Sequence, residues 1–167
     1  VAREGAGSLR RCTPQFPTQG YAQSAGMSLS RYEDFVYGAC KLQLADPVAA
    51  WREVEQRQQR LVDYLADKQH LHVRGQNIDL KMSIAGRSFL NACGTANFTD
   101  GEIFTGPVED SVNGWVKFTY PAINLGREVV GAHFEIKNGR VIKATAEKNQ
   151  EFLQAILDTD EGARTIG

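Results

Sequence analysis

Residues 114–146 have the sequence GWVKFTYPAINLGREVVGAHFEIKNGRVIKATA, in which two turn signals separate three stretches of alternating character. The turns are Asn124-Leu125-Gly126 and Asn138-Gly139, and Asn-Gly is the strongest short signal for a β-hairpin. The first stretch alternates between apolar and polar residues up to Ile123, and Pro121 within it indicates a bulge or a sheet edge. The whole segment therefore predicts a three-stranded antiparallel meander.

The middle strand of this meander has one apolar face and one polar face. His133 lies beside Glu135 on the polar face, where we expect the two side chains to be partners. The apolar face comprises Val130, Ala132, Phe134 and Ile136. A closing helix is predicted over residues 148–157, because Phe152, Leu153, Ile156 and Leu157 recur at helical spacing.

Helical patterns dominate the chain before this region. Pro17 starts a short helical turn that reaches Ala25 and is closed by Gly26, and Ser28 can cap a helix that continues to about Leu42. Asp46-Pro47 is a strong start signal for a long helix to about Asp67. The apolar face of that helix is marked by Val48, Trp51, Val54, Leu61, Val62 and Leu65.

The period changes from helical to alternating after the long helix. Strands are predicted over residues 71–74, 78–85 and 88–92, the first two around the polar turn Gly75-Gln76-Asn77. A boundary between the two kinds of structure belongs near Lys68. The sequence thus predicts an α+β fold, with a helical N-terminal part followed by a mostly antiparallel β-rich part that ends in the meander and its closing helix.

Composition excludes several classes of partner. The 167 residues include 19 basic and 20 acidic side chains, so the chain lacks the basic surface of a nucleic-acid-binding protein. No apolar run approaches the roughly 20 residues of a membrane span. Cys12, Cys40 and Cys93 are odd in number and widely spaced, which fits reduced thiols in a cytoplasmic protein better than disulfides or a zinc knuckle. Cys40 falls on an apolar helix face, and we expect it in the core.

The strongest candidate for a functional site is residues 97–111, NFTDGEIFTGPVEDS. Asp100 and Glu102 flank Gly101, and Glu109 and Asp110 follow Gly106-Pro107, so four carboxylates are presented from bent backbone. Carboxylate oxygens on such turns suit a divalent metal ion. Solvated acidic turns are the equally simple alternative from this pattern alone.

The histidines are weaker candidates for metal ligands. His70 and His72 would lie on one face of a strand, but no third ligand is near them in the sequence, which favours solvated side chains. His133 could serve as a general base, although a structural pairing is the simpler interpretation.

Other catalytic arrangements find no support in the sequence. No Gly-x-Ser-x-Gly motif, Cys-His arrangement or phosphate-binding glycine loop is present, and nothing near Cys93 indicates a thiolate. The acidic segment therefore remains as the one chemical candidate.

Several long sequence motifs of this chain resemble those of the aminopeptidase T / aminopeptidase S family of two-metal metallopeptidases. They occur in the family's order along nearly the whole chain: TPQFPT (13–18), YAQ (21–23), AGMSL (25–29), YEDFV (32–36), DPVAAWR (46–52), DGEIFTGPVEDS (100–111), ATAEKN (144–149) and LDTDEGAR (157–164).

The resemblance implies a cytoplasmic exopeptidase that removes N-terminal residues from peptides and acts as a homodimer. It implies two divalent metal ions, which in the family are zinc, cobalt, manganese or magnesium. The family's first metal-binding glutamate corresponds to Glu102, whereas Glu109 and Asp110 belong to the same motif without an assigned catalytic role. His70, His72 and His133 match none of the family's ligand histidines. The residues before Glu102, Ala96 to Thr99, depart from the family's usual Arg-Asn-x-Pro, which affects the loop's stiffness.

The resemblance also implies that the chain is part of a longer protein. Residues 1–68 correspond to the end of an N-terminal α/β domain with connecting helices, and residues 69–167 to the incomplete first part of the β-rich catalytic domain. The family's second metal-binding glutamate follows the Gly-Ala-Arg-x-x-Gly word that ends at Gly167, and the other ligands follow later, so we expect the isolated chain to be inactive. The alternative is a non-enzymatic binding or oligomerisation module that uses the acidic segment for partner contact.

Overall fold

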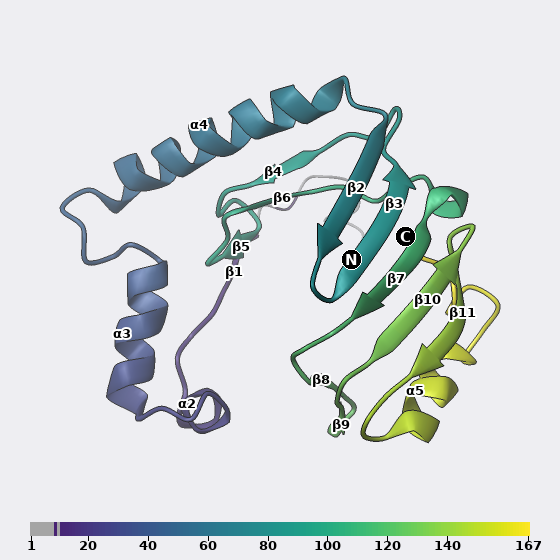
Figure 1. Cartoon of the computed structure of the whole chain (residues 1–167). Coiled ribbons are helices and arrows are strands. Elements are labelled where there is room, and N and C mark those ends of the chain that lie inside the picture. The colour runs from purple at the N-terminus through teal and green to yellow at the C-terminus, as the bar shows by residue number, and fades with distance from the viewer. Residues whose placement is uncertain (1–8, 10) are drawn as a thin grey trace. The chain divides into compact units, whose positions relative to one another are not determined.

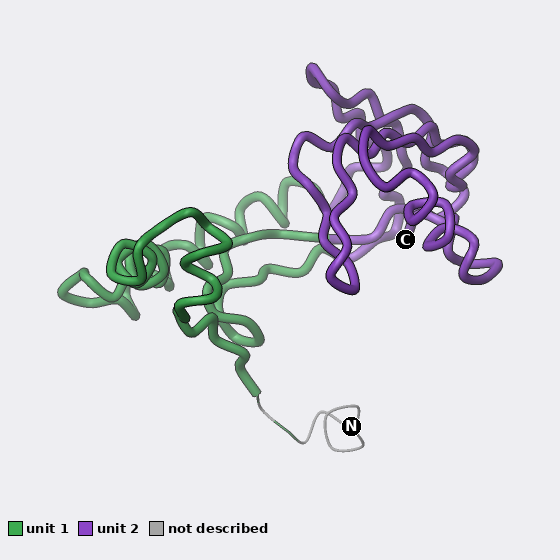
Figure 2. The backbone as a smooth tube through the Cα atoms, turned by 90° about the horizontal axis from the view of Figure 1, so that it is seen from below, with its two compact units in different colours: residues 1–65, 89–104 green, residues 66–88, 105–167 purple. Residues whose placement is uncertain are grey.

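The computed structural model describes residue 9 and residues 11–167, and its backbone separates into two compact units. The first unit comprises residues 1–65 and 89–104, and the second comprises residues 66–88 and 105–167 (Figure 2). Residues 89–104, although they follow Lys68 in the sequence, belong to the same compact unit as the residues up to 65.

The second unit is built on a five-stranded sheet with the order β11-β10-β7-β3-β2, in which every neighbouring pair is antiparallel (Figure 1). The strands are β2 (His70–Gly75), β3 (Ile78–Ser83), β7 (Asn113–Lys117), β10 (His133–Lys137) and β11 (Arg140–Thr145). The predicted hairpin around residues 75–77 is the β2–β3 pair, and the Asn138-Gly139 turn joins β10 to β11. The mixed helix and sheet composition confirms the predicted α+β class.

The core of this unit lies between the sheet and the closing helix α5 (Gln150–Leu157). Leu153 and Leu157 of α5 are buried, which confirms the apolar face predicted for this helix. Val112, just before β7, is 1% exposed. The buried cluster consists of Val112, Val129, Ala132, Ile136, Val141, Ala144, Leu153 and Leu157.

The predicted meander needs one correction. Its three strands are adjacent in the sheet as β7, β10 and β11, but β7 ends at Lys117, and residues between it and β10 form a separate hairpin of β8 (Ala122–Asn124) and β9 (Arg127–Val129). Pro121 cannot donate a ladder hydrogen bond, which accounts for the interruption before β8. The alternation also breaks between β9 and β10, so Val129 is in the core cluster, where the sequence pattern had predicted Val130.

A second irregularity lies in the β10–β11 ladder. Glu135 is opposite Lys143, whereas Ile136 is opposite Val141, so Ile142 is the extra residue of a β-bulge. Because of this extra residue, Val141 and Ala144 are both buried although they are three positions apart. The side chain of Ile142 is exposed instead.

The first unit contains the three predicted helices. They are α2 (Gln19–Ser24), α3 (Leu29–Ala39) and α4 (Pro47–Ala66). The predicted caps of the longer helices are confirmed: Ser28 Oγ accepts from Arg31 N at 3.3 Å, and Asp46 Oδ1 accepts from Ala49 N at 2.9 Å. Helix α2 begins after Pro17, which the sequence predicts as its start. The cap is Thr18, whose Oγ1 accepts from Tyr21 N.

Two small strand pairs complete the first unit. β1 (Thr13–Pro14) pairs in parallel with β5 (Asn97–Phe98), and β4 (Leu90–Ala92) pairs antiparallel with β6 (Glu102–Phe104). None of the helices in the described part of the chain combines the length and apolar character that a membrane span requires.

Aromatic packing accounts for part of the interior of this unit. The rings of Trp51 on α4 and Phe98 on β5 lie 5.3 Å apart, and Trp51 Nε1 donates to the carbonyl oxygen of Cys40 at 3.0 Å. Cys40 is buried, as predicted. Val48 and Leu61, in contrast, are exposed although the pattern placed them on the apolar face of α4.

Candidate metal site

Glu102 is the first residue of β6 and lies opposite Ala92 of β4. Its side chain is exposed, and its carboxylate makes no hydrogen bond or ion pair with the residues that the structure describes. An ionised carboxylate without a competing protein partner is available to a divalent cation, for which oxygen is a preferred ligand. Glu102 therefore fits a metal-binding role by exposure and by chemistry.

Asp100, two residues earlier, has a different environment. Its Oδ2 accepts from Gly94 N at 3.1 Å, and Gly101 N donates to Ala92 O at 3.1 Å, so the turn before β6 is closed by hydrogen bonds. Asp100 and Glu102 both line an open cavity of about 350 Å³ together with Asn97, Thr99 and Gly101. Asp100 thus holds the turn, whereas the carboxylate of Glu102 is free.

The backbone of Glu102 is held by a residue that sequence reasoning missed. Gln58 on α4 is 6% exposed, and its Nε2 donates to the carbonyl oxygen of Glu102 at 3.0 Å. Gln58 is four residues after Val54 and four before Val62, so it interrupts the apolar face of α4. A single amide side chain within the apolar face of α4 was the sequence signal that could have identified Gln58, because a buried amide needs hydrogen-bond partners.

Glu109 and Asp110 lie in the second unit, unlike Glu102. They form the 3₁₀ turn η1 (Glu109–Ser111) directly before β7, and both side chains are exposed. The following Ser111 anchors this turn, since its Oγ donates to Val108 O at 2.6 Å and accepts from Ser83 N at 2.9 Å.

The histidines have structural partners on the sheet. His72 Nε2 lies 2.7 Å from Asp79 Oδ1, and this hydrogen bond is the main reason why the pKa of Asp79 is lowered. The ring of His133 packs edge-on against Trp115 at 5.7 Å. Glu135 Oε1 accepts from Lys143 Nζ at 2.7 Å, which is the main cause of its lowered pKa, and the predicted partner His133 lowers this pKa further through its charge rather than through a hydrogen bond.

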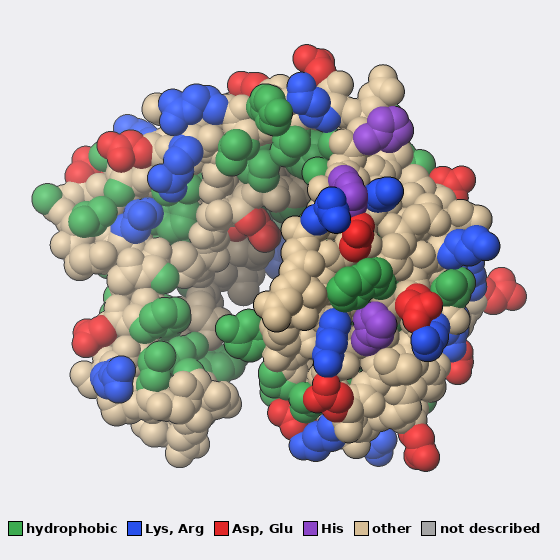
Figure 3. Space-filling view, viewed as in Figure 1, with side chains coloured by type: hydrophobic (Ala, Val, Ile, Leu, Met, Phe, Trp, Pro, Cys, Tyr) green, Lys and Arg blue, Asp and Glu red, His purple; other side chains and the backbone are tan. Residues whose placement is uncertain are grey.

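Figure 3 shows histidine side chains on this face among interspersed acidic and basic groups. Within residue 9 and residues 11–167, no three or more histidine, cysteine, aspartate or glutamate side chains gather as a metal site. The described residues consequently supply one free carboxylate near β6 and no complete ligand set.

Cys93 does not have the environment of a nucleophile. Burial is the main cause that raises the pKa of its thiol, and the negative charges of Glu55 and Asp100 raise this pKa further. The raised pKa of the Cys93 thiol agrees with the prediction that Cys93 is not a thiolate.

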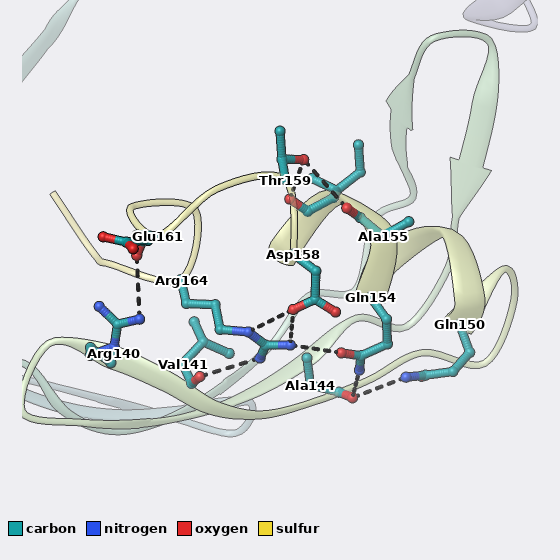
Figure 4. A network of polar contacts seen from close by, with 11 residues as sticks. Arg140, Val141, Ala144, Gln150, Gln154, Ala155, Asp158, Thr159, Glu161 and Arg164 are labelled. Carbon is teal, nitrogen blue, oxygen red and sulfur yellow. Dashed lines mark hydrogen bonds and ion pairs between the residues drawn. The ribbon is translucent and has the colours of Figure 1, made fainter.

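The Gly-Ala-Arg word near residue 164 is fixed by polar contacts to α5 and β11 (Figure 4). Arg164 Nη2 donates to Asp158 Oδ1 at 2.7 Å and to Gln154 Oε1 at 3.2 Å, and Val141 N donates to Arg164 O at 2.8 Å. The preceding Asp160 accepts from Gly162 N and Ala163 N at 2.8 Å each, so the acidic run after α5 caps a turn.

The same segment approaches the loop that follows β6. The carbonyl carbon of Gly167 is 3.6 Å from the position that a Cβ on Gly106 would occupy, and Arg87 Nε donates to Gly106 O at 2.8 Å. Gly106 is four residues after Glu102 in the sequence, so the loop after β6 and the final glycine of the Gly-Ala-Arg-x-x-Gly word meet in the second unit.

A comparison with known protein families matches residues 1–167 to the family described as thermophilic metalloprotease (M29). The chain belongs to the M29 family. Two curated relatives of this M29 chain are Aminopeptidase 2 of Geobacillus stearothermophilus, 31% identical over 90% of the chain, and Aminopeptidase T of Thermus thermophilus, 31% identical over 84%. The recognised resemblance is thereby confirmed.

A solved structure agrees with the sequence relatives. Wild-type AmpT from Thermus thermophilus superposes with a TM-score of 0.71 and 30% sequence identity over 86% of the M29 chain. The chain spans 41% of Aminopeptidase 2, 37% of Aminopeptidase T and 38% of the AmpT structure, so it corresponds to less than half of each relative.

Proposed function

We propose that the parent protein of this chain is a metal-dependent aminopeptidase that removes N-terminal residues from peptides, with Glu102 as one of its metal ligands. The observation that carries the proposal is the free, exposed carboxylate of Glu102 within the Asp100-Gly101-Glu102 word of an M29 chain whose curated relatives are aminopeptidases. When bound, divalent ions would polarise a peptide carbonyl and lower the pKa of water.

We propose that the parent protein binds two divalent metal ions, which are zinc, cobalt, manganese or magnesium. Glu102 fits such an ion by its oxygen donor and its exposure, but the described residues do not complete a ligand set. By the resemblance, a second glutamate follows Gly167.

The test is Glu102→Gln in the parent protein, with Glu151→Gln as the control, because Glu151 is an exposed glutamate on α5. Isothermal titration with Zn²⁺ and Co²⁺ and the release of N-terminal residues from peptides are the two readouts. We expect Glu102→Gln to weaken metal binding by at least about tenfold and to lower turnover, while Glu151→Gln leaves both unchanged. Equal metal binding by the two variants would reject Glu102 as a ligand, and absence of peptide turnover by the unmodified parent would favour a non-enzymatic module.

We propose further that the isolated 167-residue chain is inactive. One free carboxylate does not hold a pair of ions, and metal sites need several ligands. The purified chain should release no N-terminal residue from a peptide with added Zn²⁺, Co²⁺, Mn²⁺ or Mg²⁺, in an assay where the parent protein does. Metal-dependent turnover by the chain itself would contradict this.

Glu109 and Asp110 are proposed as candidates for carboxylates that act on the substrate, and their exposure leaves both open to solvent. If either acts in catalysis, Glu109→Gln or Asp110→Asn in the parent should lower kcat while metal binding is retained. Unchanged kcat in both variants would leave η1 with a purely structural role.

The remaining proposals concern the organisation of the parent. Residues 1–68 are assigned to the end of an N-terminal α/β domain with its connecting helices, and residues 69–167 to the first part of the catalytic domain. The chain first passes from one compact unit to the other at residues 65 and 66, which supports a boundary near Lys68, and residues 89–104 return to the first unit. The resemblance supports a cytoplasmic homodimer, and light scattering of the purified parent would test the dimer directly.

A further inference from the structure

Gln58 is a polar residue buried in the interior of the first unit. It lies on α4, its side chain is 6% exposed, and Val54, one turn before it on the same helix face, is also buried. Burial of an amide is unfavourable unless its donors and acceptor are satisfied. The position of Gln58 therefore depends on what its amide group binds.

The amide nitrogen of Gln58 joins α4 to both strands of the β4–β6 pair. Nε2 lies 3.0 Å from the carbonyl oxygen of Ala92 and 3.0 Å from that of Glu102. Ala92 and Glu102 are opposite each other in the ladder, at the end where β4 leaves the pair and β6 enters it. The Gln58 side chain thus holds the backbone of the last residue of β4 and that of the first residue of β6, which is Glu102.

Asn91 orients this contact from the neighbouring position on β4. Its Oδ1 accepts from Gln58 Nε2 at 2.7 Å, and its Nδ2 donates to the carbonyl oxygen of Glu55 at 3.0 Å and to Gln59 Oε1 at 3.2 Å. These bonds attach β4 to α4 independently of the carbonyl of Glu102. Gln58 and Asn91 together form a small network between one helix and one short hairpin.

The β4–β6 pair is short, and its connecting segment is closed by bonds from Gly94 N to Asp100 Oδ2 and from Gly101 N to Ala92 O. β4 and β6 are three residues each, and an isolated two-stranded pair of this length is marginally stable in water. The carboxylate of Glu102 is exposed and makes no hydrogen bond or ion pair with the described residues, so its position depends on its own backbone. The contact from Gln58 is the nearest side-chain restraint on that backbone.

We propose that Gln58 is a positioning residue for the metal site, which fixes the backbone of Glu102 and thereby the direction in which its carboxylate is presented. This inference rests on the proposed role of Glu102. Groups that orient metal ligands without touching the metal commonly change metal affinity by about 10- to 100-fold when they are removed. Gln58 would act in this way through a backbone carbonyl.

The test uses Gln58→Met in the full-length parent protein, because methionine fills a similar volume and donates no hydrogen bond. The matched control is Gln56→Ala, which changes an exposed glutamine of the same helix. Co²⁺ is the probe, since its affinity and its visible absorption spectrum report ligand number and geometry. We expect Gln58→Met to bind Co²⁺ about tenfold more weakly, with an altered spectrum and a lower kcat at nearly unchanged KM.

Gln58→Leu keeps the test decisive if Gln58→Met fails to fold, because leucine also lacks the amide that reaches Glu102. Asn91→Ala removes an acceptor that orients Gln58 but leaves the Gln58 amide able to reach Glu102, so a smaller change in Co²⁺ affinity and spectrum is expected. Native Co²⁺ affinity and spectrum in a folded Gln58→Met protein, or in Gln58→Leu where Gln58→Met does not fold, would overturn the inference. Absence of Co²⁺ binding by the unmodified parent, or native binding by Glu102→Gln, would instead overturn the proposed function.

Discussion

A Cβ on Gly139 would lie 1.6 Å from the carbonyl oxygen of Glu109, so the Asn138-Gly139 turn fits against η1 only without a side chain at this position. Asn138 and Gly139 have φ values of +48° and +72°, which a type I′ hairpin turn requires. Gly139 N also donates to Val112 O at 2.9 Å. The turn is thus fixed by its own conformation and by close packing.

Gly139→Ala should therefore destabilise the second unit by at least about 3 kcal/mol, from backbone strain and overpacking together. Gly126→Ala is the matched control, because Gly126 has a φ of +73° but no atom within 4 Å of the added Cβ. We expect about 1 kcal/mol for the control, measured by urea unfolding of the chain. Equal losses in the two variants would show that packing against Glu109 contributes nothing.

The three thiols should react in a fixed order. Cys12 is exposed, Cys93 has a raised thiol pKa, and Cys40 is buried. Because the thiolate is the reactive form, alkylation at pH 7.5 should modify Cys12 first and Cys93 more slowly, with Cys40 protected until the chain unfolds. Mass spectrometry of timed samples gives the order, and modification of Cys93 before Cys12 would contradict it.

Asp79 should titrate below an ordinary aspartate because His72 hydrogen-bonds to its carboxylate. A lowered folded-state pKa means that the contribution to stability is complete above the unfolded-state pKa and is lost as the pH falls through the folded-state pKa. His72→Ala should raise the pKa of Asp79 towards the value of an unpaired aspartate, as measured by carbon NMR of the carboxyl group. His70→Ala is the control, and an unchanged Asp79 pKa in His72→Ala would exclude the hydrogen bond as the cause.

Arg164→Ala should loosen the segment after α5. The guanidinium bonds Asp158 and Gln154, and we expect a loss of about 1 to 2 kcal/mol because hydrogen bonds to a charged group are removed. Hydrogen exchange should accelerate at the amide of Ile166, which donates to Gly139 O at 2.8 Å. Arg60→Ala on the exposed side of α4 should leave that amide unchanged, and equal exchange in both variants would count against the anchoring role.

Local signals in the sequence were sufficient for most of the elements. Ser28 and Asp46 predicted helix starts because a cap acts within three residues, and Asn138-Gly139 predicted its hairpin because a type I′ turn selects for those residues. The prediction of the meander was incomplete, because the β8–β9 hairpin and the bulge at Ile142 depend on which strands become neighbours. His133 and Glu135 are adjacent on one strand face and interact through their charges, but the ring contact of His133 and the hydrogen bond of Glu135 are with Trp115 and Lys143 of the neighbouring strands.

The sequence by itself determined the class of fold, the helix caps, the β10–β11 turn and, through long shared words, the family. Each of these depends on residues that are close together in the chain or on the order of motifs along it. Only the tertiary structure decided that Gln58 contacts Glu102, that Glu109 and Asp110 belong to a different compact unit from Glu102, and that Gly106 meets Gly167. The two contacts join residues 44 and 61 positions apart, and hydrogen bonds and close packing over such separations leave no periodic pattern in the sequence.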